Sequence, residues 1–181
     1  MAAWGPPVPI APGEHAELLR ALGRFFEQED ARQIEVVNYG DFVSISWRKQ
    51  DPMGGELHYR EHELAELRRR AREARSGIQY DPLGGWAEML RTLGQDLDHE
   101  YADLSSILQK DAGFVVAYQI RGRYAQRQYR IADVLTSSRT RRALRQGMKS
   151  LATASALSST TAVPQLAAAT KGPLERRLRP Y

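Results

Sequence analysis

The chain has 181 residues, 42% of them apolar, a formal net charge of +4 and no cysteine. This length is enough for one domain or two small ones with buried cores. The lack of cysteine excludes disulfides, thiolate metal sites and cysteine nucleophiles. Residues 1–7 lack a basic region followed by an apolar run, and no uncharged stretch approaches the roughly 20 apolar residues of a spanning helix. We therefore expect a cytoplasmic protein with no membrane partner.

The predicted elements follow a proline-rich start, residues 1–13, which we interpret as an extended arm. Apolar residues at spacings of three and four, such as Leu18, Leu22 and Phe26, predict a first helix. Alternating residues then predict three short strands, over residues 34–37, 43–47 and 57–59. A second helix is predicted from about residue 61 to 75, closed by Ser76 and Gly77.

The same pattern recurs farther along the chain at a constant offset. Residues 16–31 align with residues 87–102 with eight identities in sixteen positions. The offset also keeps the alternation of the second strand in one phase, so that equivalent apolar residues face the same side. These residues are Val43, Ile45 and Trp47 in the first copy, and Phe114, Val116 and Tyr118 in the second. A one-residue deletion then places Tyr59 on Tyr129.

This repeat predicts an α+β fold made by tandem duplication of an α-β-β-β-α unit. Residues 14–77 form the first copy, residues 78–85 a linker and residues 86–150 the second copy. Two helices per copy can cover one face of each antiparallel sheet. Because the linker is short and contains apolar residues, we expect the copies to associate about a pseudo-twofold axis.

A low-complexity tail of alanine, serine and threonine with a basic end follows, residues 151–181. It has no periodic apolar stripe, so we expect it to be disordered or extended on its own. Its mixed apolar and basic end suits docking onto a larger partner. The candidate docking residues are Leu174, Arg176, Arg177, Leu178, Arg179 and Tyr181.

The charge changes sign within the second copy. Residues 81–112 contain seven acidic and two basic residues, whereas residues 113–149 contain nine basic residues and one acid, Asp133. Guanidinium groups bind phosphate bidentately, and counterion release favours their binding to nucleic acids. The candidate nucleic-acid contacts are Arg121, Arg123, Arg127, Arg130, Arg139, Arg141, Arg142, Arg145 and Lys149. For the last five, pairing with the acidic residues of a helix at 96–103 is an alternative of equal weight.

One motif resembles a metal site. His58, Glu61 and His62 fit the H-x-x-E-H pattern of the zinc-binding helix in one group of metalloproteases. Zinc binding there needs both histidines on one helical face. His58, however, falls at the end of a predicted strand and His62 in the first turn of a predicted helix. We therefore expect both to face solvent, and we predict no metal and no cofactor.

The α-β-β-β-α order resembles that of double-stranded RNA-binding domains, and each copy would cover one such unit. That family has a lysine cluster at the start of its second helix. The corresponding positions here are Glu61, His62 and Glu63 in the first copy, and Ile131, Ala132 and Asp133 in the second. The resemblance is therefore one of topology and carries over no binding residues.

Two functions remain open, and both are non-enzymatic because the sequence has neither a phosphate-binding glycine loop nor a nucleophile elbow. The basic stretch favours a nucleic-acid-binding or nucleoprotein-associated protein. The duplicated scaffold and extended termini favour a protein–protein interaction or assembly subunit that docks onto a larger complex. The expected partner is thus a nucleic acid, a larger protein complex, or both.

Overall fold

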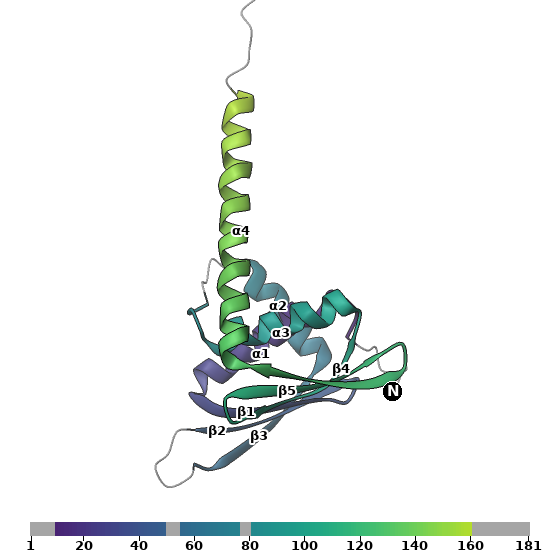
Figure 1. Ribbon diagram of the computed structural model, residues 1–181. Helices are drawn as coiled ribbons and strands as arrows, with labels where there is room; N and C mark the ends of the chain where they lie inside the picture. The colour runs from purple at the N-terminus through teal and green to yellow at the C-terminus, as the bar shows by residue number, and fades with distance from the viewer. Residues whose placement is uncertain (1–9, 50–54, 77–80, 161–181) are drawn as a thin grey trace, which may run out of the picture. The chain divides into compact units, whose positions relative to one another are not determined.

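Helices and strands combine in an α+β fold (Figure 1). The computed structural model describes residues 10–49, 55–76 and 81–160. In these residues the elements are α1 (His15–Gln28), β1 (Ala31–Asn38), β2 (Phe42–Lys49), β3 (Leu57–Glu63), α2 (Leu64–Ser76), α3 (Trp86–Glu100), β4 (Asp103–Lys110), β5 (Gly113–Ile120), β6 (Arg123–Arg130) and α4 (Ile131–Thr160). The chain divides into two units, residues 1–143 and 144–181, and the first contains the whole sheet.

The six strands form one antiparallel sheet in the order β3-β2-β1-β4-β5-β6. Strands β1 to β3 pair consecutively, as do β4 to β6, and the two groups join where β1 pairs with β4. The centre of this join is Val36, which lies opposite Ile107. These two residues occupy equivalent positions in the aligned halves of the sequence, so the strand order on either side of the join is the same.

One face of the sheet carries the core, and the helices cover this face (Figure 1). The alternating residues of β2 and β5 are buried, as their phase in the sequence predicts. They are Val43, Ile45 and Trp47 in β2, and Phe114, Val116 and Tyr118 in β5. Leu67 of α2 and Val134 of α4 join the same core, as does Ile10 at the end of the predicted arm. Within residues 10–143, the described helical segments leave the opposite face of the sheet uncovered (Figure 1).

Two glycines set the distance between α1 and α3. A Cβ atom at Gly94 would lie 2.7 Å from the Cα atom of Ala16, and one at Gly23 would lie closer still to the Cα atom of Ala87. Any larger residue would therefore push the two backbones apart. Gly23 and Gly94 are equivalent in the aligned halves of the sequence, as are Ala16 and Ala87, so the same contact occurs twice.

Each of these helices is also capped by a carboxylate from the other. Asp98, near the end of α3, accepts three hydrogen bonds from backbone N–H groups at the start of α1. The donors are Gly13, His15 and Ala16, at 2.7, 3.1 and 3.0 Å. Glu27, near the end of α1, accepts one from the N–H of Ala87 in α3, at 3.1 Å. These bonds satisfy N–H groups that have no partner within the helix at its start. The negative charge of each carboxylate also interacts favourably with the helix dipole.

The predicted alignment of the third strands is wrong. Tyr59 lies opposite Ser46 and Tyr129 lies opposite Phe114, which places the two tyrosines on opposite faces of the sheet. The position equivalent to Tyr129 is His62, because the path from β5 to β6 is shorter than that from β2 to β3. The sequence alignment therefore misses the true equivalence by an odd number of positions, and an odd error turns every side chain to the other face.

The last helix is longer than the sequence pattern predicts. α4 continues to Thr160, although the composition predicts a tail from residue 151 onward. Residues 151–160 include alanine and leucine and lack glycine and proline, a composition that favours a helix even without an apolar stripe. The docking residues predicted from Leu174 to Tyr181, like residues 1–9 of the predicted arm, lie outside the described residues.

Candidate functional site

The arginines predicted to contact nucleic acid are spread over several elements. Arg121 lies in the two-residue turn between β5 and β6, and Arg123 and Arg130 lie at the two ends of β6. With a rise of about 3.3 Å per residue, these two strand ends are roughly 23 Å apart. The remaining arginines are Arg127 of β6, and Arg139, Arg141, Arg142 and Arg145 of α4. The side chain of Lys149 lies outside the described part of the structure.

Arg127 is exposed, but its guanidinium is paired within the protein. Its guanidinium donates to the Glu100 carboxylate at 2.5 Å and to the Tyr129 hydroxyl at 3.4 Å. It also lies over the ring of Tyr118, 5.9 Å from the ring centroid. The hydrogen bond to Glu100 raises the pKa of Arg127 above its usual value. A phosphate would compete with this carboxylate for the guanidinium of Arg127.

Two arginines of α4 are engaged in the same way. Arg141 donates to the Asp96 carboxylate at 2.5 Å and to the Thr92 carbonyl at 3.1 Å, both on α3. Arg142 lies 3.8 Å from the Glu88 carboxylate. For Arg141, pairing with the acidic residues is therefore the alternative that the structure shows. The acidic stretch itself, residues 96–103, spans the end of α3 and the first residue of β4.

The other predicted contacts are more accessible. Arg121, Arg123, Arg130 and Arg139 are exposed, and none of them forms an ion pair with another described residue. Arg145 is half-buried. The predicted contacts thus comprise exposed cations on the turn before β6, on β6 and on α4, together with arginines that pair with carboxylates.

Exposed apolar side chains are distributed over the uncovered face of the sheet, from one edge strand to the other. Among the described residues, nine large apolar side chains are exposed, and five of them lie on this face. They are Tyr39 (58% exposed), Leu57 (57%), Tyr59 (62%), Leu108 (39%) and Tyr124 (67%). Tyr39 belongs to this face because its ring stacks on that of Phe42, at 4.8 Å between centroids. Exposed apolar side chains on a sheet face that no helix covers are a feature of surfaces that bind another macromolecule.

In the middle of this face, Leu108 of β4 lies between Glu35 of β1 and Val115 of β5, its partners in the two neighbouring strands. The sequence pattern does not reveal this surface, because the misaligned third strands hide the fact that Tyr59 and Tyr124 share a face. Seven charged residues on this face have a partner in the register of a neighbouring strand. They are four acids, Glu35, Glu61, Glu63 and Asp103, and three bases, Arg48, Lys110 and Arg130.

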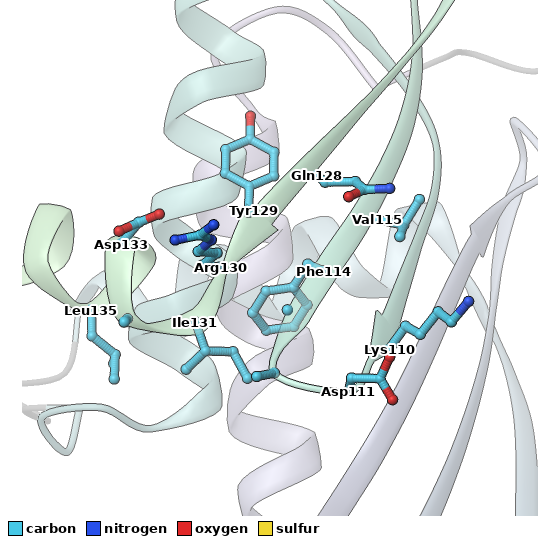
Figure 2. A pocket seen from close by; sticks show the side chains of 13 residues that line it. Lys110, Asp111, Phe114, Val115, Gln128, Tyr129, Arg130, Ile131, Asp133 and Leu135 are labelled. Carbon is cyan, nitrogen blue, oxygen red and sulfur yellow. The ribbon is translucent and has the colours of Figure 1, made fainter.

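A hollow of about 950 Å³ opens where the turn between β4 and β5 meets the start of α4 (Figure 2). Phe114 and Tyr129 form part of its wall. Its charged residues are Lys110, Asp111, Arg130 and Asp133. Two acids balance two bases, and Asp133 stands in the first turn of α4, where an anion would otherwise be favoured. The hollow therefore has no preference for a phosphate group.

The predicted position of the two histidines needs correction. His58 and His62 both belong to β3, and His62 is buried at 1% exposure instead of facing solvent. The ring of His62 packs against Phe25 at 5.3 Å between centroids, and neither ring nitrogen has a hydrogen-bond partner in the described structure. Burial lowers the pKa of His62. No group of three metal-ligating side chains occurs among the residues that the structure describes.

Comparison with known proteins adds no relative: no family model, no curated protein and no solved structure matches this chain. Within the described ranges, no helix has the length and apolar character needed to cross a membrane. The site must therefore be interpreted from its own geometry.

Proposed function

We propose that this chain is a non-enzymatic protein–protein interaction subunit that receives a protein partner on the uncovered face of its sheet. The observation that carries this proposal is that Tyr39, Leu57, Tyr59, Leu108 and Tyr124 are all exposed on the same face of the sheet. Apolar side chains gain free energy when a partner removes them from water, by about 25 cal/mol per Å² of apolar surface. Tyrosines in particular are enriched where protein partners bind.

The charge of the face supports a protein rather than a nucleic acid as its partner. Four acids stand against three bases in its regular strand pairs, so these residues supply no excess positive charge for a phosphate backbone. A matching partner surface combines apolar side chains with charges of both signs, as in most protein interfaces.

The test compares two charge insertions. Leu108→Glu places a charge in the middle of the face, at a side chain that is already 39% exposed. Leu83→Glu is the matched control, because Leu83 is 63% exposed but lies before α3, outside the sheet. The partner is recovered from the source cells with the wild-type chain, identified by mass spectrometry, purified and titrated against all three proteins. We expect a loss of affinity of about tenfold or more for L108E only. Equal affinities would refute the proposal.

A second candidate function is nucleic-acid binding, favoured by the exposed arginines Arg121, Arg123, Arg130 and Arg139. Four phosphate contacts would give a salt slope of about −3 to −4 in a plot of log K against log salt concentration. A mobility-shift titration at several salt concentrations measures this slope. Binding that is absent at low salt, or indifferent to salt, would exclude this function.

The recurrence of contacts supports a duplication as the origin of the fold. The contacts of Gly23 and Gly94, and the caps by Glu27 and Asp98, are each related by the offset that aligns residues 16–31 with residues 87–102. We propose that the two α-β-β-β-α copies associate about a pseudo-twofold axis through the pair formed by Val36 and Ile107. In this view the two copies supply one continuous face.

A further inference from the structure

The strand β6 stands at one edge of the sheet. It pairs with β5 on one side, and no described strand pairs with it on the other. It is eight residues long, its pairing with β5 is regular from Arg123 to Arg130, and it contains no proline. An edge strand with these properties is a template for a further strand, because its outward backbone groups are free to bond.

The turn before β6 determines which backbone groups point outward. Arg121 and Gly122, with φ angles of 51° and 75°, form a two-residue turn, so the flanking pair Ile120 and Arg123 is hydrogen-bonded within the hairpin. Since inward and outward residues alternate along a strand, the outward set consists of Tyr124, Gln126, Gln128 and Arg130. Their N–H and C=O groups are not used by β5.

The charge along this edge has one sign. Residues 121–130 contain four arginines and no acid. Three of these arginines, Arg121, Arg123 and Arg130, are exposed and form no ion pair with a described residue. The opposite edge strand, β3, carries two acids, Glu61 and Glu63, and one cation, Arg60. An acidic strand is thus attracted to β6 and repelled by β3.

We propose that β6 binds an extended acidic segment of a partner protein, which adds to the sheet as a seventh strand. The inference rests on the proposed protein-binding function but uses the edge of the sheet rather than its face. The chain's own segment 161–181 is a poor occupant, because its charged residues are four bases and one acid. The β6 strand of a second copy is equally poor, since it would bring arginines opposite arginines.

The first measurement needs no variant. A peptide of alternating glutamate and valine, as long as β6, is added to the full chain, and amide hydrogen exchange is followed by NMR. We expect exchange at Gln126 and Gln128 to slow by about tenfold or more, because their N–H groups gain partners. Ala125 and Arg127, whose N–H groups already bond to β5, serve as internal controls. A matched peptide of alternating lysine and valine should leave all four amides unchanged.

The second measurement removes one outward N–H group. Gln126→Pro deletes this donor without breaking a bond to β5, and an edge strand tolerates proline at such a position. Gln126→Ala is the matched control, because it removes the side chain and keeps the N–H. We expect the proline variant to weaken binding of the glutamate peptide about tenfold, measured by fluorescence anisotropy, and the alanine variant by less than about twofold. Thermal unfolding confirms that both variants are folded.

Four results would overturn the proposal: unchanged exchange at Gln126 and Gln128, equal binding of both peptides, equal effects of the two substitutions, or displacement of the peptide by a short oligonucleotide. Self-association that depends on concentration and is lost in Q126P would assign the edge to a second copy instead. The Leu108→Glu titration remains independent of these results, so the failure of the edge and the failure of the face are distinguishable.

Discussion

Asp98 caps the start of α1, although it lies far from this helix start in the sequence. Of its backbone donors, Gly13 is the most distant in sequence. Its carboxylate accepts three backbone N–H groups and also contacts the Nδ1 atom of His15 at 2.8 Å. We expect Asp98→Ala to lower the free energy of unfolding by about 2 kcal/mol, the upper range for a lost cap. Urea denaturation measures this change. Asp103→Ala, at an exposed carboxylate, should change it by less than about 0.5 kcal/mol.

His62 makes stability depend on pH. Its ring is buried, and the nearby cations Arg60 and Arg70 add to the effect of burial in lowering its pKa, whereas Glu66 opposes them. The folded protein therefore protonates this ring at a lower pH than the unfolded chain, in which its ordinary pKa is 6.5. The free energy of unfolding must then fall as the pH falls through 6.5, by at most about 1.4 kcal/mol per pH unit for this group.

His62→Leu tests this dependence, because leucine fills the site without a titratable group. We expect the difference in urea midpoint between about pH 7.5 and about pH 5.5 to be smaller in this variant than in the wild type. The carboxylates, which are the same in both proteins, cancel in the comparison. An identical pH dependence of the two proteins would show that His62 is accessible to protons in the folded state.

At the scale of elements, the packing of α1 on α3 depends on Gly23 and Gly94. Alanine has the higher helix propensity by about 1 kcal/mol, but a Cβ atom at either position would collide with the backbone of the other helix. We expect Gly23→Ala and Gly94→Ala each to lower stability by about 1–3 kcal/mol in chemical denaturation. Gly147→Ala is the control, because nothing lies within 4 Å of its added Cβ atom. If all three substitutions stabilised the protein, the close approach would be refuted.

The sequence predicts the central strands well and the edge strands poorly. Val43, Ile45 and Trp47 alternate with more polar residues because one face of β2 is buried, so their phase is visible in the sequence. β3 has only His62 fully buried, and its residues Leu57 to Glu63 therefore show no alternation. The register of β3 is set by its pairing with β2. The sequence of β3 alone does not contain this information. This is why the sequence alone places His62 on a helix.

The candidate site shows the same limit. The sequence gives the positions of the arginines, but it does not show which of them are paired. The carboxylates that pair with Arg127 and Arg141 lie far from them along the chain. Only the fold brings these carboxylates to them. The uncovered face could not be predicted either, because its Tyr59, Leu108 and Tyr124 come from three strands whose relative register the sequence leaves open.

At the scale of the whole molecule, the two α-β-β-β-α halves share one sheet and one core. We therefore expect a single cooperative unfolding transition of residues 10–143. Gly94→Ala should raise amide exchange at Val36 and at Val116 by the same factor, although only Val116 belongs to the substituted half. Hydrogen exchange followed by NMR measures both rates. Faster exchange at Val116 alone would show that the halves unfold independently.

The exchange of caps between α1 and α3 also constrains how such a chain can evolve. Asp98 serves the first half and Glu27 serves the second, so each gene segment encodes a part that the other segment needs. A recombination event that moved one half into another protein would leave a helix start without its carboxylate on both sides of the break. We therefore expect the replacement of one half alone to destabilise the starts of both helices.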